Sequence, residues 1–224
     1  MYLHVDRKVD NSILDVGCGT GLLGIASEPF LGTHGRYVGI DVVKREIEFC
    51  RNHFPSAAFE FIHLDISNPA YTPSQKSERV GWPVKPASFD LVTALSTWTH
   101  LNEEDALFYF KEVGRVLKPG GKAIITFFLL DEIYEKGLDA RSKATGRYHM
   151  TSQGKWVFDQ PAYGSNDWFH PAWATVPESA VGVTENGLNR LISEAGIGLV
   201  QRFPGNWKEV PGVFFQDVII FQKS

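Results

Sequence analysis

Short runs of consecutive apolar residues alternate along this chain with stretches whose apolar residues are spaced for a helix. An apolar run of about four to eight residues between turn residues is typical of a strand buried on both faces. Apolar residues three and four positions apart are typical of an amphipathic helix. The alternation predicts an α/β fold. The predicted strands cover residues 13–16, 36–41, 58–66, 89–94, 122–130, 198–203 and 214–222, and the predicted helices cover 22–30, 42–53, 103–117 and 185–195.

The first predicted strand ends in a glycine-rich turn, Asp15-Val16-Gly17-Cys18-Gly19-Thr20-Gly21, directly before a helix. Glycine adopts backbone angles that a β-carbon disfavours, and it lets a ligand approach the main chain closely. The unpaired N–H groups at the start of the helix point back into the turn and hold an anionic group without a basic side chain. The turn therefore predicts a binding site for a small, partly anionic ligand.

Two kinds of ligand fit this turn. The spacing Gly19-x-Gly21-x-x-Gly24 is formally the fingerprint of dinucleotide-binding proteins, although a single match is a weak signal. The carboxylate of Asp15 at the end of the strand would repel a pyrophosphate and attract an α-amino group. The residues thus favour a ligand with an amino-acid end, and a nicotinamide dinucleotide remains the alternative.

Two further segments carry candidate chemistry. Asp41 follows the second strand about 20 residues beyond the glycines, the spacing at which an acid meets a ribose in doubly wound sheets. It can also cap the next helix, and the two roles are compatible. Residues 95–101 follow the fourth strand, where the sheet order reverses and a crevice forms. His100 in this segment is the candidate general base, and capping or packing is its alternative role.

Composition limits the classes of partner. The 224 residues suit one domain, with 43% hydrophobic and 21% charged residues. A net charge of −4 and a pI of about 6.0 argue against a large nucleic-acid or anionic-membrane footprint. No apolar run approaches the ~20 residues of a membrane span. Two cysteines, Cys18 and Cys50, imply neither a disulfide framework nor a metal cluster, so a cytoplasmic location is the default.

The motifs together resemble the class I S-adenosylmethionine-dependent methyltransferases, in their small-molecule, methyltransferase type 11-like branch. Asp15 with its glycines matches the first motif of that family, 89–92 followed by His100-Leu101 matches a later motif, and 116–121 matches the turn into the fifth strand. The resemblance covers roughly residues 12–130. The Asn/Asp-Pro-Pro-Tyr signature of enzymes that methylate nucleobases or protein amides is missing after the fourth strand.

The resemblance implies a Rossmann-like sheet of seven strands in the order 3-2-1-4-5-7-6, doubly wound and mostly parallel, with an antiparallel C-terminal hairpin and helices on both faces. It also implies S-adenosylmethionine as cofactor and S-adenosylhomocysteine as product. The methionine end would lie on the glycine turn, Asp41 would meet the ribose, and Asp65 and the N–H of Ile66 would meet the adenine. The expected cofactor residues are Asp15, Gly17, Cys18, Gly19, Gly21, Asp41, Val42, Asp65, Ile66, Ala94, Leu95 and Ser96.

The implied reaction is methyl transfer to a small-molecule or sugar- or lipid-like acceptor, on oxygen, with His100 as the base. His149 and His170 are weaker candidates, and a metal is disfavoured because no His, Asp and Glu cluster has ligand spacing. A nicotinamide-dependent oxidoreductase and a non-catalytic module that binds the cofactor or its demethylated product are the alternatives. The oligomeric state is left open.

Residues 131–177 interrupt the single predicted domain with many aromatic residues among Gly, Pro and Ser. We expect this insertion to be a lid over the crevice, with Trp156, Trp168 and Trp173 facing an apolar or ring-shaped acceptor. A satellite hydrophobic cluster is the alternative. Trp82, in a proline-rich loop, is either an anchor or part of a rim. Family members often carry N-terminal helices that cover the cofactor. Residues 1–11 are too short for this, so another segment covers it or the chain is part of a longer protein.

Overall fold

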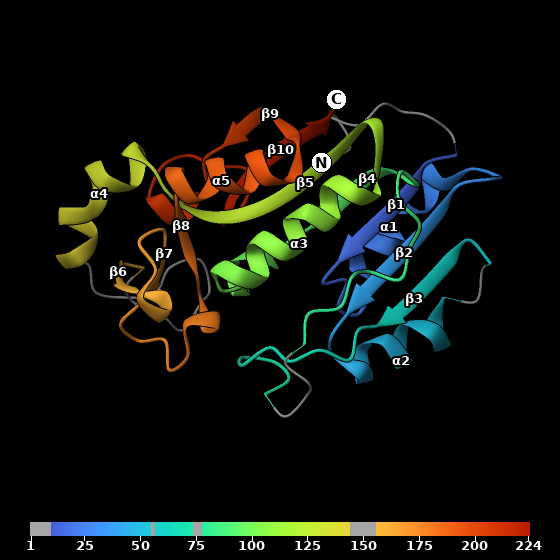
Figure 1. The fold of residues 1–224 in the computed structure, drawn as a ribbon, viewed down its shortest axis with the longest axis horizontal. Helices are drawn as coiled ribbons and strands as arrows, with labels where there is room; N and C mark the ends of the chain where they lie inside the picture. Colours follow the sequence, from blue (N-terminus) through green and yellow to red (C-terminus); the bar gives the residue numbers. More distant parts are fainter. Residues whose placement is uncertain (1–9, 55–56, 74–77, 144–155) are drawn as a thin grey trace.

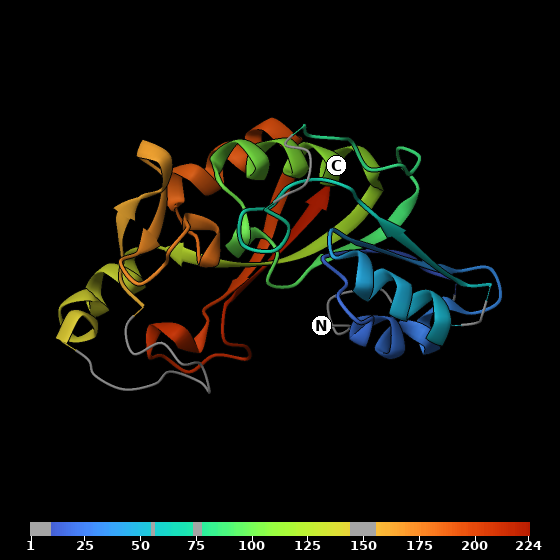
Figure 2. The ribbon, with the colours of Figure 1, turned by 90° about the horizontal axis from the view of Figure 1, so that it is seen from below.

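The fold is a mixed sheet between two layers of helices (Figures 1 and 2). The computed structural model describes residues 10–54, 57–73, 78–143 and 156–224. Five strands pair in parallel in the order β3-β2-β1-β4-β5. They are β1 (Ser12–Val16), β2 (Arg36–Asp41), β3 (Phe59–His63), β4 (Phe89–Ala94) and β5 (Leu117–Leu130).

A C-terminal hairpin completes this sheet. β10 (Asp217–Lys223) is antiparallel both to β5 and to β9 (Ile197–Phe203). In order along the chain these seven strands give the arrangement 3-2-1-4-5-7-6, which confirms the predicted topology. The order reverses between β1 and β4, so a crevice forms beyond the carboxyl ends of these strands.

Helices cover both faces of the sheet, as predicted. Figure 2 shows α1 (Leu22–Leu31) and α2 (Lys44–His53) on one face, and α3 (Glu103–Val116) and α5 (Glu185–Ala195) on the other. Successive strand residues point to opposite faces, so Ile13 packs in the cluster of α1 and α2 while Leu14 packs in that of α3 and α5. This explains why the strands read as continuous apolar runs.

The segment between β5 and α5, residues 131–184, extends the sheet; it is longer than the predicted insertion of 131–177, and it is called the insertion from here on. It begins with α4 (Glu132–Lys143), and β8 (Gly182–Thr184) then pairs in parallel with the end of β5. β7 (Trp168–Pro171) and β6 (Phe158–Pro161) continue antiparallel, at the opposite end of the molecule from β3 (Figure 1). Strands this short leave no clear period-two signal, which is why the sequence did not predict them.

Most aromatic residues of the insertion pack in a hydrophobic cluster of their own. Trp156 and Phe158 are buried there against Phe128 of β5, and Tyr134 and Trp207 close the cluster. In the described part of the chain, single-turn 3₁₀ helices connect the elements: η2 (Trp98–His100), η3 (Ala162–Gly164), η4 (Pro177–Ser179) and η5 (Asn206–Lys208). Of these, η2 and η4 bear on the functional site.

Candidate functional site

The glycine turn lies between the ends of β2 and β4. Gly17, Gly19 and Gly21 have φ angles of +73°, +52° and +82°, in the left-handed region that favours glycine. A β-carbon on Gly17 would also lie 2.4 Å from Oγ1 of Thr97. The Gly17 N–H donates to the carbonyl of Ile40 at 2.8 Å, so the turn is fastened to β2. The backbone angles of these glycines are as the sequence predicted, the close contact of Gly17 is with Thr97, and the close approach of a ligand stays a prediction.

A cavity of about 290 Å³ opens beside this turn, at the crevice where the sheet order reverses. Its wall comes from the turn, the exits of β2, β3 and β4, and the segment that leads into α3. The sequence-predicted residues that line the cavity are Gly17, Gly19, Asp41, Val42, Ile66, Leu95, Ser96 and His100. The predicted residues outside the lining are Asp15, Cys18, Gly21, Asp65 and Ala94.

Asp41 joins the glycine turn to the start of α2. One carboxylate oxygen accepts from the N–H of Gly19 at 2.8 Å, and the other accepts from the N–H of Val43, also at 2.8 Å. Val43 is the N-cap residue of α2, so Asp41 also orders the turn that begins this helix. A carboxylate has lone pairs for further donors, and two hydroxyl groups of a ligand can still bind it.

Asp15 lies beneath the turn and is almost fully buried. Its two oxygens accept from the hydroxyl of Tyr37 and from Oγ1 of Thr93, the second at 2.9 Å. Burial raises the pKa of Asp15 to about 6, although both hydrogen bonds oppose the rise. The geometry gives Asp15 a role in joining β1, β2 and β4 under the turn. A direct contact with an α-amino group stays a prediction.

The β3 exit carries residues that the sequence did not single out. Asp65 is exposed, whereas Ile66, Asn68 and Tyr71 line the cavity. The Asn68 side chain accepts from the N–H of Ala70 at 3.0 Å and donates to the carbonyl of His100 at 2.8 Å. A proline-rich loop gives no regular pattern, so no local signal identifies these residues in advance.

His100 is held from two sides. Its Nδ1 contacts the carbonyl oxygen of Glu178 at 2.8 Å, and the edge of Tyr71 packs on its ring with centroids 5.2 Å apart. A carbonyl oxygen only accepts, so Nδ1 carries the proton and Nε2 carries the lone pair of the neutral ring. Burial lowers the pKa of His100, which favours this neutral form. His170 lies on β7 away from the lining, and His149 lies outside the described residues.

The aromatic residues that line the cavity do not come from the described part of the insertion. Trp82 is 3% exposed and stacks on Tyr109 at 5.9 Å, so it is an anchor rather than a rim residue. The backbone N–H of Trp82 donates to Glu112 at 2.7 Å, and its backbone carbonyl accepts from Arg115 at 2.9 Å. Both partners lie on α3, so the helix fixes the loop that carries Trp82.

The prediction that tryptophans of the insertion face a ligand is wrong for the described cavity. Trp168 is 1% exposed beneath Arg190, and Trp156 packs edge-on against Trp173 at 5.2 Å. None of the three lines the cavity. Trp156 and Trp173 pack in the satellite cluster, the alternative that the sequence left open, whereas Trp168 belongs to the main core.

The lining of the cavity is acidic. Asp41 and Glu46 both belong to it, and among the described residues no Lys or Arg does. Burial, and then the nearby charge of Asp41, raise the pKa of Glu46. Such a lining favours a cationic group in the ligand over a diphosphate. In the described part of the chain no group of three His, Cys, Asp or Glu residues could hold a metal ion, and no helix is long and apolar enough to cross a membrane.

Comparisons with known proteins agree with this geometry. A family model described as a methyltransferase domain matches residues 13–121. The ubiquinone biosynthesis O-methyltransferase of Idiomarina loihiensis is 30% identical over 53% of this chain and 43% of its own length. The O-methyltransferase resE of Aspergillus sclerotiorum is 30% identical over 57% of this chain and 44% of its own. The matched part thus spans less than half of either relative.

A solved structure extends the likeness to the whole fold. An S-adenosylmethionine-dependent methyltransferase from Mesorhizobium loti superposes with a TM-score of 0.63. The alignment covers 98% of this chain and 94% of that one, at 16% identity. At this identity the match bears on the fold alone, including the C-terminal hairpin that follows the family-model region.

Proposed function

This chain belongs to the class I S-adenosylmethionine-dependent methyltransferases, and we propose that it methylates a small organic acceptor on oxygen. The acidic lining of the cavity carries the proposal, because the cofactor of this family is a sulfonium cation. Asp41 and Glu46 would stabilise that charge, whereas the two phosphates of a nicotinamide dinucleotide would be repelled. The names of the O-methyltransferase relatives support oxygen as the methylated atom.

The described residues fit the parts of this cofactor. The turn at Gly17 and Gly19 would receive the methionine end. Asp41 would accept from the two ribose hydroxyls, and Val42 with Ile66 would enclose the adenine. The Ser96 hydroxyl accepts from Gln216 at 2.8 Å, so its proton is free to be donated into the cavity.

When bound, S-adenosylmethionine supplies an already activated methyl group. The protein's task is then to align the acceptor and to remove its proton. Alignment of two reactants can contribute about 7–11 kcal/mol in ideal cases, and a positioned base contributes about 10²–10⁴-fold. His100 is the proposed base, since Nδ1 is engaged by Glu178 and Nε2 can accept a proton.

Calorimetry with S-adenosylmethionine, S-adenosylhomocysteine and NAD tests the cofactor assignment. We expect heat of binding from the first two and none from NAD. Binding of NAD without binding of S-adenosylhomocysteine would contradict the proposal and favour the oxidoreductase alternative. Incubation with methyl-labelled cofactor and a set of phenols, catechols and hydroxylated lipids then tests transfer. Tight cofactor binding with no transfer to any of them would favour a non-catalytic module.

The His100→Gln variant tests the base. We expect its rate of methyl transfer to fall by about 10²–10⁴-fold while its affinity for S-adenosylhomocysteine stays within about twofold. The wild-type rate should be at its plateau at pH 7 and should fall as the pH drops through a value below 6.5, because burial lowers the pKa of His100. An unchanged rate in the variant would exclude His100 as the base.

A further inference from the structure

The segment that carries His100 runs beside the end of the insertion. The Thr99 carbonyl accepts from the N–H of Val181 at 2.7 Å, and Nδ1 of His100 donates to the carbonyl of Glu178 at 2.8 Å. These two bonds pair residues 99–100 with 178–181. The insertion therefore reaches the proposed base directly, through its backbone.

The side chain of Glu178 fixes the position of that carbonyl. It is fully buried, and its two oxygens accept from Nδ2 of Asn102 at 3.2 Å and from the hydroxyl of Tyr163 at 3.0 Å. A buried carboxylate needs such donors because water cannot reach it. One donor is the N-cap residue of α3 and the other lies on η3, so Glu178 joins the insertion to the start of α3.

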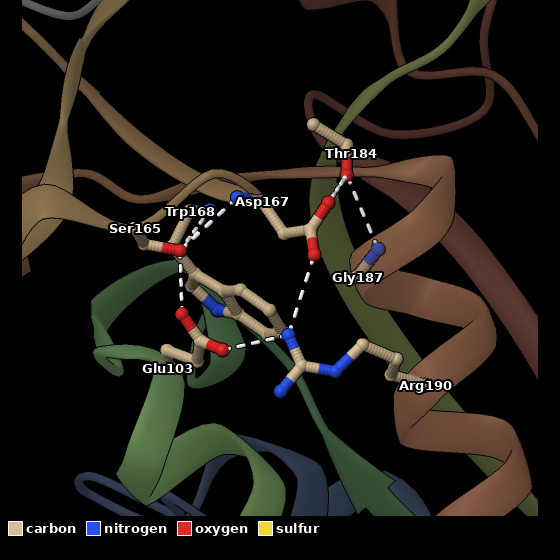
Figure 3. A network of polar contacts seen from close by, with 7 residues as sticks. All are labelled: Glu103, Ser165, Asp167, Trp168, Thr184, Gly187 and Arg190. Atoms are coloured by element: carbon tan, nitrogen blue, oxygen red, sulfur yellow. Dashed lines mark hydrogen bonds and ion pairs between the residues drawn. The ribbon is translucent and has the colours of Figure 1, made fainter.

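A polar network fastens the insertion one residue further along α3 (Figure 3). Glu103 accepts from Oγ of Ser165 and forms an ion pair with Arg190 at 2.7 Å. Arg190 also pairs with Asp167 at 3.3 Å and lies over the ring of Trp168. Figure 3 shows one nitrogen of Arg190, from α5, joined to both Glu103 and Asp167 beside the ring of Trp168. The insertion and α5 therefore both contact the first turn of α3.

None of the described residues of the insertion lines the cavity. We propose that the insertion is a positioning element for His100, and that Glu178 is the positioning residue which keeps His100 in its Nδ1-protonated tautomer. This proposal rests on the proposed function, in which Nε2 accepts the proton of the methyl acceptor. The insertion contacts His100 on its Nδ1 side, and the cavity stays open to the acceptor.

The physical reason lies in the two ring nitrogens. A neutral imidazole carries one proton, and the hydrogen bond made by one nitrogen decides which nitrogen holds it. With Glu178 displaced, both tautomers become populated and water reaches the ring. Among the described residues, the titratable side chain that packs on His100 is Tyr71 on the β3–β4 loop, and Glu178 on η4 contacts His100 through its backbone carbonyl. Both stay in place in the variants below, except where Glu178 is itself replaced.

Nitrogen-15 NMR of histidine-labelled protein tests the tautomer without knowledge of the acceptor. The His100 signals are assigned by their loss in His100→Gln. In the wild type we expect a protonated Nδ1 and an unprotonated Nε2. In Glu178→Gln the side-chain amide turns a donor toward Asn102 or Tyr163, so we expect the Nε2-protonated form to appear and the pKa to rise toward 6.5.

Two ion-pair variants separate positioning from general stability. Arg190→Gln breaks the network at Glu103 and Asp167, and we expect a smaller change of the His100 signals in the same direction. Lys111→Gln breaks another α3–α5 ion pair, to Glu194 at 2.7 Å, away from the insertion. The side chains of Arg190 and Lys111 are both partly exposed, so both variants should fold. We expect wild-type His100 signals in Lys111→Gln.

The proposal is overturned if wild-type His100 carries its proton on Nε2, or if Glu178→Gln and Arg190→Gln both give wild-type signals. The proposed function fails by a different measurement, the absence of any binding of S-adenosylhomocysteine. A protonated Nδ1 that disappears in Glu178→Gln would support the positioning role whatever that binding experiment gives.

Discussion

At the scale of single residues, two aspartates at neighbouring strand ends have different environments. Asp41 accepts from two N–H groups at the cavity wall and keeps access to a ligand. Asp15 is enclosed by Tyr37 and Thr93 below the glycine turn. We therefore expect a change at Asp41 to alter ligand affinity, and a change at Asp15 to alter how the stability of the protein depends on pH.

Asp41→Asn should weaken cofactor binding. The amide group has one acceptor oxygen where the carboxylate has two, so it would turn a donor toward the N–H of Gly19 or of Val43 and accept fewer ligand hydroxyls. Such a loss costs about 1–3 kcal/mol, or about 5–150-fold in affinity. Calorimetry with S-adenosylhomocysteine measures this loss. Asp65→Asn is the matched control at the next strand exit, where the side chain is exposed. An equal loss in both variants would restore Asp65 as a binding residue.

The stability of the wild type relative to Asp15→Asn should depend on pH, and it should be greater at pH 4 than at pH 7. Burial raises the pKa of Asp15 from the ordinary 3.8 to about 6, so the folded protein holds this proton more tightly than the unfolded chain does. Its stabilising contribution is complete below about pH 4 and is lost as the pH rises through about 6. A tenfold change in proton affinity is about 1.4 kcal/mol, so the whole effect is of the order of 3 kcal/mol. Urea unfolding of both proteins between pH 4 and 7 measures it, and a constant difference across this range would contradict the assignment.

At the scale of elements, the turn after β3 presents Tyr71 across the cavity. Thr72 and Asn68 close this turn, since Oγ1 of Thr72 donates to the Ile66 carbonyl at 2.9 Å and its N–H donates to the Asn68 carbonyl at 2.7 Å. The ring of Tyr71 packs on His100 on one wall. Burial, with the charges of Asp41 and Glu46 on the other wall, raises the pKa of Tyr71. The turn therefore places Tyr71 in the cavity lining, in contact with His100.

Tyr71→Ala should release S-adenosylhomocysteine faster. Loss of one aromatic contact of about 0.5–1.5 kcal/mol corresponds to a dissociation rate about three- to tenfold higher. Stopped-flow fluorescence can follow release, because Trp82 and Trp98 line the same cavity. Tyr71→Phe keeps the ring and should dissociate nearly as the wild type does. A wild-type rate in the alanine variant would show that Tyr71 does not retain the ligand.

At the scale of the whole molecule, a buried charge cluster joins three distant parts of the chain. The side chain of Lys208 is 0% exposed and forms ion pairs with Asp131 at 2.8 Å and with Asp217 at 2.9 Å. Asp217 also accepts from the N–H groups of Leu129 and Gly205, both at 2.8 Å. The start of the insertion, η5 and β10 therefore depend on one cation.

Lys208→Met should destabilise the whole fold. Removing one partner of a buried ion pair leaves uncompensated charge and costs about 3–5 kcal/mol. Urea unfolding measures the loss of free energy of unfolding. Lys136→Met is the control, because its pair with Glu132 is exposed and such pairs contribute about 0–1 kcal/mol. Similar losses in the two variants would mean that the buried cluster is not a structural centre.

The sequence by itself determined the seven strands of the main sheet, the helices between them and the glycine turn, and the strand order was implied by the family resemblance. These follow from local properties: apolar periodicity, the left-handed angles at Gly17, Gly19 and Gly21, and motifs whose residues lie close together in the chain. The same local signals placed Asp41 and His100 at the crevice, which they do line. The ligand contacts predicted for these residues remain to be tested.

Only the tertiary structure decided how those residues are surrounded. His100 meets Glu178 across 78 positions of sequence, and Trp82 meets Arg115 across 33. It also decided that Trp156 packs in a separate cluster and Trp168 in the main core, while Trp82 lines the cavity. No local pattern encodes such choices, because whether an aromatic or ionisable side chain is exposed depends on which distant surface packs against it.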